Sequence, residues 1–195
     1  MIYRYFLLNK PYGYLSQFSG EKDDLLLGQF FNFPKDVYSV GRLDKDSEGL
    51  LLLTNDNRFK TKVLSKESKW EKEYWVQVEN GINQEAIRLL ESGTMEIEHK
   101  GSRVRVSKGK CQIMSPPEIN ERVPPIRYRK SIPTSWISLT LTEGKNRQVR
   151  KMTAKAGYPT LRLIRFRIGP FTLNNLQPGE VIELEERVIR KYFNN

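Results

Sequence analysis

Apolar and polar positions follow two different periods along this chain, and each period predicts one kind of element. Alternating positions predict strands at 72–78 and 136–142, and four consecutive leucines at 50–53 predict a buried strand. Shorter apolar runs bounded by turn residues predict further strands at 3–9, 37–40 and 181–184, and a hairpin or two within 95–114.

Helical spacing of apolar residues predicts a second set of elements. It is found at Phe59, Val63 and Leu64, at Ala86, Ile87 and Leu90, and at Val149, Met152, Thr153 and Ala156. Asp56 and Asn83 are suited to cap the first two helices, and Gly157 is suited to end the third. A shorter helix is expected at 25–30, capped by one of the acids at 23–24, and another at the C-terminus.

Strands and helices in one chain predict a protein of the α+β class. Because no internal repeat, low-complexity tract or linker interrupts the chain, we expect residues 1–195 to form a single domain. The Pro-rich segment 115–133 is expected to be a loop within that domain. Its basic residues are candidates for phosphate contact or for a solvated surface, and they are Arg122, Arg127, Arg129 and Lys130.

The charge balance points toward a polyanionic partner. The chain has 33 Lys and Arg against 23 Asp and Glu, which leaves a formal charge of +10. A protein this basic usually meets nucleic acid, although a merely solvated basic surface is the alternative. Nine Tyr, nine Phe and three Trp indicate a folded core, which argues against a disordered basic tail.

Several classes of protein are disfavoured by what the sequence lacks. The single Cys111 cannot form an internal disulfide, and the one His99 beside it does not make a metal-binding set. The apolar run near the N-terminus is too short for a signal peptide or a membrane span, and Lys10-Pro11 ends it. We therefore expect a soluble cytoplasmic protein with no metal and no membrane association.

The segment 41–56, GRLDKDSEGLLLLTND, places a charged, glycine-containing loop directly before the leucine strand. An ordinary polar turn is one interpretation. A calcium loop is a second, because Asp44, Asp46, Glu48 and Gly49 match the first half of an EF-hand; however, its twelfth position is an asparagine. The third is that Asp44 is a catalytic carboxylate, placed beside an arginine at the mouth of a strand.

This segment resembles the aspartate motif of the RsuA-type pseudouridine synthase family. The resemblance extends over almost the whole chain, through KPYG at 10–13, KEY at 72–74, EGKNRQVRKM at 143–152 and GYPTLRLIR at 157–165. It implies the α+β catalytic fold of that family, a mixed, mainly antiparallel, bent sheet flanked by helices, with an active cleft across the middle of the sheet. It also implies isomerisation of uridine to pseudouridine within RNA, a reaction that needs no metal or cofactor.

In that reaction the bond from ribose C1′ to uracil N1 breaks, the base turns, and C5 bonds to C1′. One carboxylate can start it, either by attacking C1′ or by removing a ribose proton, and the sequence does not choose between these. The resemblance implies that Asp44 is this carboxylate, that Lys145 is the cation that keeps it ionised, and that Tyr74 stacks on the uracil and moves the C5 proton.

Further residues are implied to contact RNA. Arg42 fills the gap left by a flipped base, and Leu161 and Leu163 line the pocket or simply pack in the core. Arg147, Arg150 and Lys151 are candidates for phosphate contact or a solvated helix face. The remaining candidates come from the same motifs, and they are Lys10, Leu43 and Gln148.

The position of the first motif bears on the substrate. Many RsuA-type relatives carry an S4-like RNA-binding domain before the catalytic part, but here KPYG begins at residue 10, so we expect this chain to have no such domain. The chain therefore most resembles the short branch of large-subunit (23S) rRNA synthases of type E. We expect a monomer that modifies 23S rRNA. The alternatives are the same reaction on 16S rRNA or tRNA, and a non-catalytic protein of rRNA binding or ribosome assembly.

Overall fold

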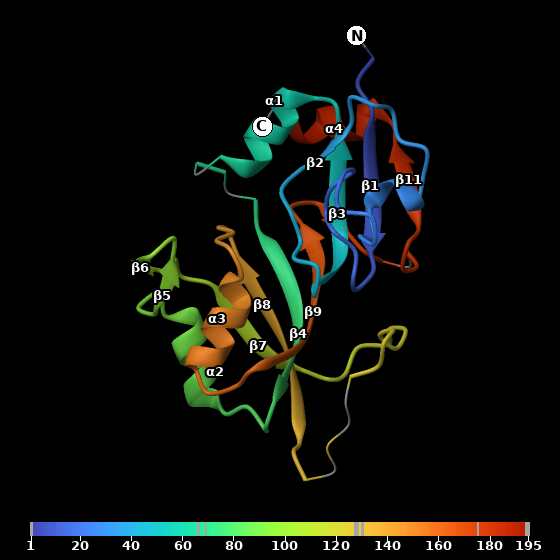
Figure 1. Cartoon of the computed structure of the whole chain (residues 1–195). Helices are drawn as coiled ribbons and strands as arrows, with labels where there is room; N and C mark the ends of the chain where they lie inside the picture. Colours follow the sequence, from blue (N-terminus) through green and yellow to red (C-terminus); the bar gives the residue numbers. More distant parts are fainter. Residues whose placement is uncertain are drawn as a thin grey trace. The chain divides into compact units, whose positions relative to one another are not determined.

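The computed structural model describes residues 2–65, 67–68, 70–126, 129, 131–174 and 176–193. The chain divides into two compact units (Figure 1). Unit 1 comprises Met1–Trp70 and Phe171–Asn195, and unit 2 comprises Glu71–Pro170. Both units combine antiparallel strands with helices, which confirms the predicted α+β class. In the part of the chain that the structure describes, no helix has the length and apolar character needed to cross a bilayer.

Unit 1 is built on β1, which lies between β11 and β3 with antiparallel pairing on both sides. The two-residue strand β2 pairs with the other edge of β3. The elements of this unit are β1 (Tyr5–Lys10), η1 (Leu27–Gln29), β2 (Tyr38–Ser39), β3 (Glu48–Thr54), α1 (Asn57–Leu64), β10 (Phe171–Thr172), β11 (Val181–Leu184) and α4 (Glu186–Phe193).

Both faces of the central strands of unit 1 are covered, which explains the uninterrupted leucine run of β3. Phe6 lies opposite Leu53 in the ladder, and both belong to a core cluster with Leu27. On the other face, the Tyr5 ring meets the edge of Phe59 from α1, with ring centroids 5.4 Å apart. A strand buried on both faces needs apolar residues at every position, because neither face meets water.

Helix α1 begins where the sequence predicts. The Asp56 carboxylate accepts hydrogen bonds from the backbone N–H groups of Arg58 and Phe59, at 2.9 and 3.2 Å. It also accepts a hydrogen bond of 2.7 Å from the buried Tyr5 hydroxyl. The same carboxylate therefore caps α1 and fixes this helix to β1.

Unit 2 is a four-stranded antiparallel sheet in the order β9-β4-β8-β7, beside a separate hairpin. Helices α2 and α3 lie on one side of this sheet (Figure 1), and both contribute to its large core cluster. The elements are β4 (Lys72–Glu79), α2 (Gln84–Glu91), β5 (Glu96–His99), β6 (Ser102–Arg105), β7 (Lys110–Met114), β8 (Thr134–Leu141), α3 (Gln148–Lys155) and β9 (Thr160–Ile168).

Some local predictions need correction. The segment 25–30 forms only the 3-10 turn η1, because no side chain caps it and Gly28 lies within it. The Asp24 carboxylate instead accepts a hydrogen bond from the backbone N–H of Glu21. The hairpin predicted within 95–114 is confirmed as β5-β6, and the next strand β7 pairs with β8.

The Pro-rich segment 115–133 connects β7 to β8, and its described residues are outside helices and strands. The Arg129 guanidinium contacts the Glu79 carboxylate at 3.1 Å, so this residue is tied to β4. Arg127 and Lys130, two of the basic residues proposed for phosphate contact, lie outside the described residues.

The single cysteine, Cys111 on β7, is predicted to be unreactive in the folded protein. It is 7% exposed, and burial, with a smaller contribution from Glu91, raises the pKa of its thiol to about 12. Only the thiolate reacts with iodoacetamide, so we expect negligible labelling of native protein near pH 8 and complete labelling in guanidinium.

The raised pKa of Cys111 also sets the sign of its effect on stability. The neutral thiol contributes fully below the unfolded pKa of 9.0, and its contribution to the free energy of unfolding declines as the pH rises from there toward about 12. Labelling of native protein at the rate of denatured protein would contradict this burial.

Candidate functional site

Asp44 lies in the connection between β2 and β3, two strands that pair antiparallel. Gly41 begins this connection with a φ of 74°, a conformation that glycine adopts without strain. The backbone N–H of Ser47 donates to the carbonyl of Asp44 at 3.0 Å and closes a turn before β3. Residues 41–47, hereafter the Asp44 loop, lead to the start of β3, whereas β2 pairs with the far end of β3 at Leu53 and Thr54.

Two hydrogen-bonded contacts from the segment after β1 hold the Asp44 loop. The Ser16 hydroxyl donates to the carbonyl of Leu43 at 2.8 Å and accepts from the N–H of Leu43 at 3.0 Å. The N–H of Gly13 donates to the carbonyl of Lys45 at 2.8 Å. The residues on both sides of the half-buried Asp44 are therefore fixed, which gives the backbone that carries Asp44 a defined position.

Lys10 stabilises the segment after β1 that holds the Asp44 loop. Its side chain is fully buried, and its ammonium donates to the carbonyls of Pro11 and Tyr14 at 2.8 Å each. These bonds stabilise the turn that leads to Gly13. The resemblance implies that Lys10 contacts RNA, which stays a prediction; in this structure its ammonium holds the backbone. Arg42 is exposed and is available for such a contact.

The calcium interpretation does not fit this segment. An EF-hand that starts at Asp44 needs a loop conformation as far as Asn55. Instead, β3 begins at Glu48 and pairs with β1 from Gly49 to Thr54. The backbone of the required second half is therefore committed to a sheet, which leaves it unable to wrap around an ion.

In unit 2, Tyr74 lies on β4 between Leu139 of β8 and Arg165 of β9. Tyr74 is 8% exposed and, together with Leu163, belongs to the core cluster of the unit. Leu161 on β9 is half-buried. Core packing, the alternative interpretation of Tyr74 and Leu163, therefore accounts for most of the surface of both side chains.

Lys145 precedes α3 in a polar network. Its ammonium forms an ion pair with the Glu143 carboxylate, which also accepts hydrogen bonds from Gln148 Nε2 at 2.6 Å and from the N–H of Ser107 at 2.9 Å. Burial opposes ionisation of Glu143, but the bonds from Lys145, Ser107 and Gln148 together lower the pKa of Glu143 below its usual value. The carboxylate therefore stays charged and holds Lys145 in place.

The polar candidates on α3 differ in where they lie. Arg147 is exposed and adopts a left-handed conformation, with φ of 51°, at the start of the helix. Gln148 is only 3% exposed, and its carbonyl oxygen accepts from the N–H of Lys145 at 2.9 Å. Both the oxygen and the nitrogen of the Gln148 amide thus order the Lys145 network inside the fold, and the RNA contact of Gln148 stays a prediction.

Arg150 and Lys151 are half-buried, contrary to the outer position expected for them. The ammonium of Lys151 donates to the carbonyl of Glu98 at 2.7 Å, which attaches α3 to β5. Of the three cations proposed on this helix, Arg147 therefore has the most accessible side chain.

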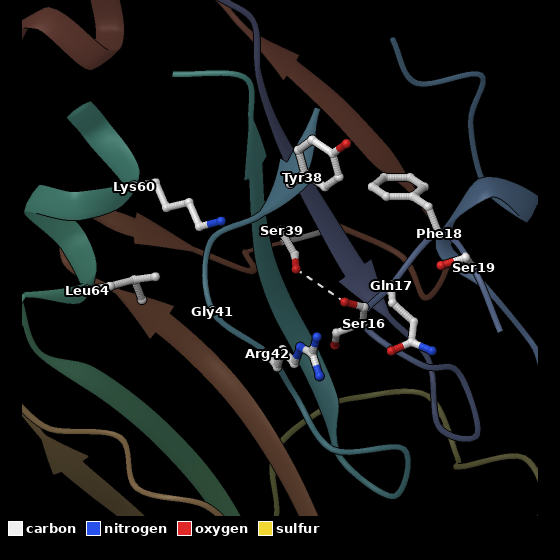
Figure 2. A pocket seen from close by; sticks show the side chains of 10 residues that line it. All are labelled: Ser16, Gln17, Phe18, Ser19, Tyr38, Ser39, Gly41, Arg42, Lys60 and Leu64. Atoms are coloured by element: carbon white, nitrogen blue, oxygen red, sulfur yellow. Dashed lines mark hydrogen bonds between the residues drawn. The ribbon is translucent and has the colours of Figure 1, made fainter. Parts of the chain in front are cut away.

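A pocket of about 410 Å³ opens beside the Asp44 loop in unit 1 (Figure 2). It extends from Arg42 along β2 to α1. The residues that line it are Ser16, Gln17, Phe18, Ser19, Tyr38, Ser39, Gly41, Arg42, Lys60 and Leu64. Except for Arg42, sequence reasoning missed this set, because it comes from separate segments that share no motif and no common period.

Comparison with known proteins is consistent with these motifs. Residues 4–155 match the RNA pseudouridylate synthase family. A protein of Vibrio parahaemolyticus named ribosomal large subunit pseudouridine synthase E is 44% identical over 179 residues, which cover 92% of this chain and 73% of that protein. The protein of the same name from Xanthomonas campestris is 42% identical over 186 residues, covering 94% and 97% of the two chains.

The fold is matched among solved structures as well. A crystal structure of a pseudouridylate synthase superimposes with a TM-score of 0.78 at 27% identity, and the match covers 97% of this chain and 74% of that one. A more distant match, at 16% identity and a TM-score of 0.57, is an H/ACA RNP bound to a substrate RNA, and it supports the fold alone.

Proposed function

This chain belongs to the RNA pseudouridylate synthase family, and from this premise we propose that it acts on one uridine of 23S ribosomal RNA with Asp44 as the catalytic carboxylate. The enzyme is an isomerase that converts uridine to pseudouridine in RNA. The observation that carries the assignment of Asp44 is the double attachment of its loop, at Leu43 and at Lys45. Catalysis depends on such fixed geometry, because small displacements of a reacting group are costly.

The chemistry requires Asp44 to begin as a carboxylate and to be returned unchanged. The carboxylate either attacks ribose C1′ or removes a ribose proton, and in both routes the bond from C1′ to N1 breaks. The uracil turns and C5 bonds to C1′. In the first route this bond displaces the Asp44 oxygen from C1′, and in the second route Asp44 returns its proton to the ribose. The proton then leaves C5 while N1 gains one. Atoms and electrons balance within the nucleotide, so the product is an isomer of the substrate.

We assign Tyr74 to the C5 proton and Lys145 to stabilisation of the carboxylate, with the two units acting as a single catalytic domain. Support for Lys145 comes from Glu143, which holds its ammonium at the start of α3. For Tyr74 the support is its match to the family motif. Arg42 is exposed two residues before Asp44 and is assigned to the space that the flipped base leaves.

The proposal of 23S rRNA rests on the relatives. Proteins named ribosomal large subunit pseudouridine synthase E cover almost all of this chain at 42% and 44% identity. A formal charge of +10 supports binding to an RNA backbone. We further propose that the protein acts as a monomer in the cytoplasm, where rRNA is made and assembled.

The substrate proposal is tested with purified protein and unmodified transcripts of 23S rRNA, 16S rRNA and tRNA. We expect pseudouridine at one position of the 23S transcript and at none in the other RNAs. With about six to ten phosphate contacts, affinity should fall roughly 10³- to 10⁵-fold between low and physiological salt. Modification of 16S rRNA or tRNA instead would overturn the choice of substrate and leave the reaction intact.

A further inference from the structure

We propose that the pocket beside the Asp44 loop binds one nucleotide of the RNA substrate that neighbours the isomerised uridine, with its base stacked on Tyr38. This inference rests on the proposed function and deepens it, because it gives the enzyme a site that recognises a nucleotide next to the target uridine. The pocket residues other than Arg42 are not among those assigned above to the reaction.

The pocket has a suitable size and shape for a nucleotide. Its volume of about 410 Å³ lies within the range of small-ligand sites. One wall is the segment 16–19, a second is the segment 38–42, and the third is α1. Figure 2 shows Lys60 reaching from α1 toward the segment that carries Arg42, which puts two cations at the pocket.

The chemistry of the lining also suits a nucleotide. Tyr38 is 58% exposed, and an aromatic ring this accessible offers a stacking surface for an unpaired base. Among the described residues that line the pocket, Arg42 and Lys60 are cations and none is acidic, which favours a phosphate. Gln17 supplies an amide that both donates and accepts, as the edge of a base requires.

The position of the pocket explains why its occupant is a neighbour of the target. Arg42 lines the pocket and lies two residues from Asp44, a backbone separation of at most about 7 Å. Ser16 also lines it, and the hydroxyl of Ser16 holds the backbone of Leu43. A nucleotide in this pocket therefore contacts Ser16, the residue that fixes the Asp44 loop.

A series of substrate RNAs tests this inference. Each RNA lacks the base of one nucleotide flanking the target uridine, and kcat/KM is measured with wild type, Tyr38→Ala and Tyr38→Phe. With wild type, we expect one abasic position to lower kcat/KM by about 5- to 150-fold, equivalent to about 1–3 kcal/mol of base stacking. With Tyr38→Ala, kcat/KM for the same abasic RNA should be less than about 2-fold below that for the intact RNA, because this variant has already lost the stacking on Tyr38.

Two further variants complete the design. Tyr38→Phe keeps the ring and should keep the sensitivity to the abasic position. Tyr192→Ala removes an exposed aromatic of α4 that does not line the pocket, and its sensitivity should equal that of wild type. If the decrease in kcat/KM is the same for Tyr38→Ala and wild type at every abasic position, the proposed nucleotide site is wrong, whereas the assignment of the enzyme is unaffected. Absence of isomerisation by wild type on any RNA would overturn the proposed function and this inference with it.

Discussion

Replacement of Asp44 by asparagine is expected to abolish isomerisation and to preserve RNA binding. The amide has the shape of the carboxylate but cannot act as a nucleophile or a base, so we expect the single-turnover rate to fall by about 10³-fold or more. The turn of the Asp44 loop uses the backbone carbonyl of this residue, so the substitution leaves that bond in place. Pseudouridine formation and the RNA dissociation constant are measured on the same preparation.

Asp46→Asn is the matched control, because Asp46 is half-buried in the same loop and is not assigned to the reaction. We expect its rate to remain within a few fold of wild type. Full activity of Asp44→Asn would remove Asp44 from the catalytic role. Wild-type RNA binding without any turnover by the wild-type protein would instead favour the non-catalytic, rRNA-binding alternative.

Ser16→Ala is expected to lower kcat by about 10²-fold, because the loop that carries Asp44 loses its attachment at Leu43. The substitution leaves a buried N–H and a buried carbonyl without this partner, so the free energy of unfolding should also fall by about 1–3 kcal/mol. We expect a smaller change in KM, because the cations that bind RNA are unaffected. Steady-state kinetics at a temperature where the variant is folded separate these effects.

Thr54→Val controls for the loss of stability alone. The Thr54 hydroxyl donates to the carbonyl of Arg4 at 2.7 Å and accepts from the N–H of Asp56 at 3.0 Å, so it also makes two bonds to backbone groups. Its loss should lower stability to a similar extent while kcat stays near that of wild type. Equal kcat for Ser16→Ala and Thr54→Val would show that Ser16 has only a structural role.

The elements that the sequence predicted well are those set by local chemistry. The leucines of β3 and the alternation of β4 report burial directly, because side chains on a strand point to opposite faces. The alternation of β8 predicts a strand but not its burial, because Ser138 and Thr140 are buried along with their apolar neighbours. Asn83 caps α2 through a hydrogen bond from the N–H of Ala86 at 2.8 Å, as the residue type indicates.

The parts of the site that the sequence could not predict depend on contacts between distant residues. Ser16 and Leu43 are 27 residues apart, and no period or motif links a serine in one turn to the backbone of another. Gln148 was predicted to meet RNA because it is polar and lies in a motif. Its burial follows from the Glu143 carboxylate, which needs a donor inside the fold. Residue type alone does not show whether a polar side chain contacts RNA or makes a hydrogen bond inside the fold.

A pseudouridine map of total rRNA from cells with and without this gene, complemented by wild type or by Asp44→Asn, tests whether Asp44 catalyses the modification of 23S rRNA. We predict that one 23S rRNA position loses pseudouridine when the gene is absent, and that wild type restores it while Asp44→Asn does not. An unchanged map at every rRNA position would contradict the assignment of 23S rRNA as substrate, and restoration by Asp44→Asn would contradict the catalytic role of Asp44.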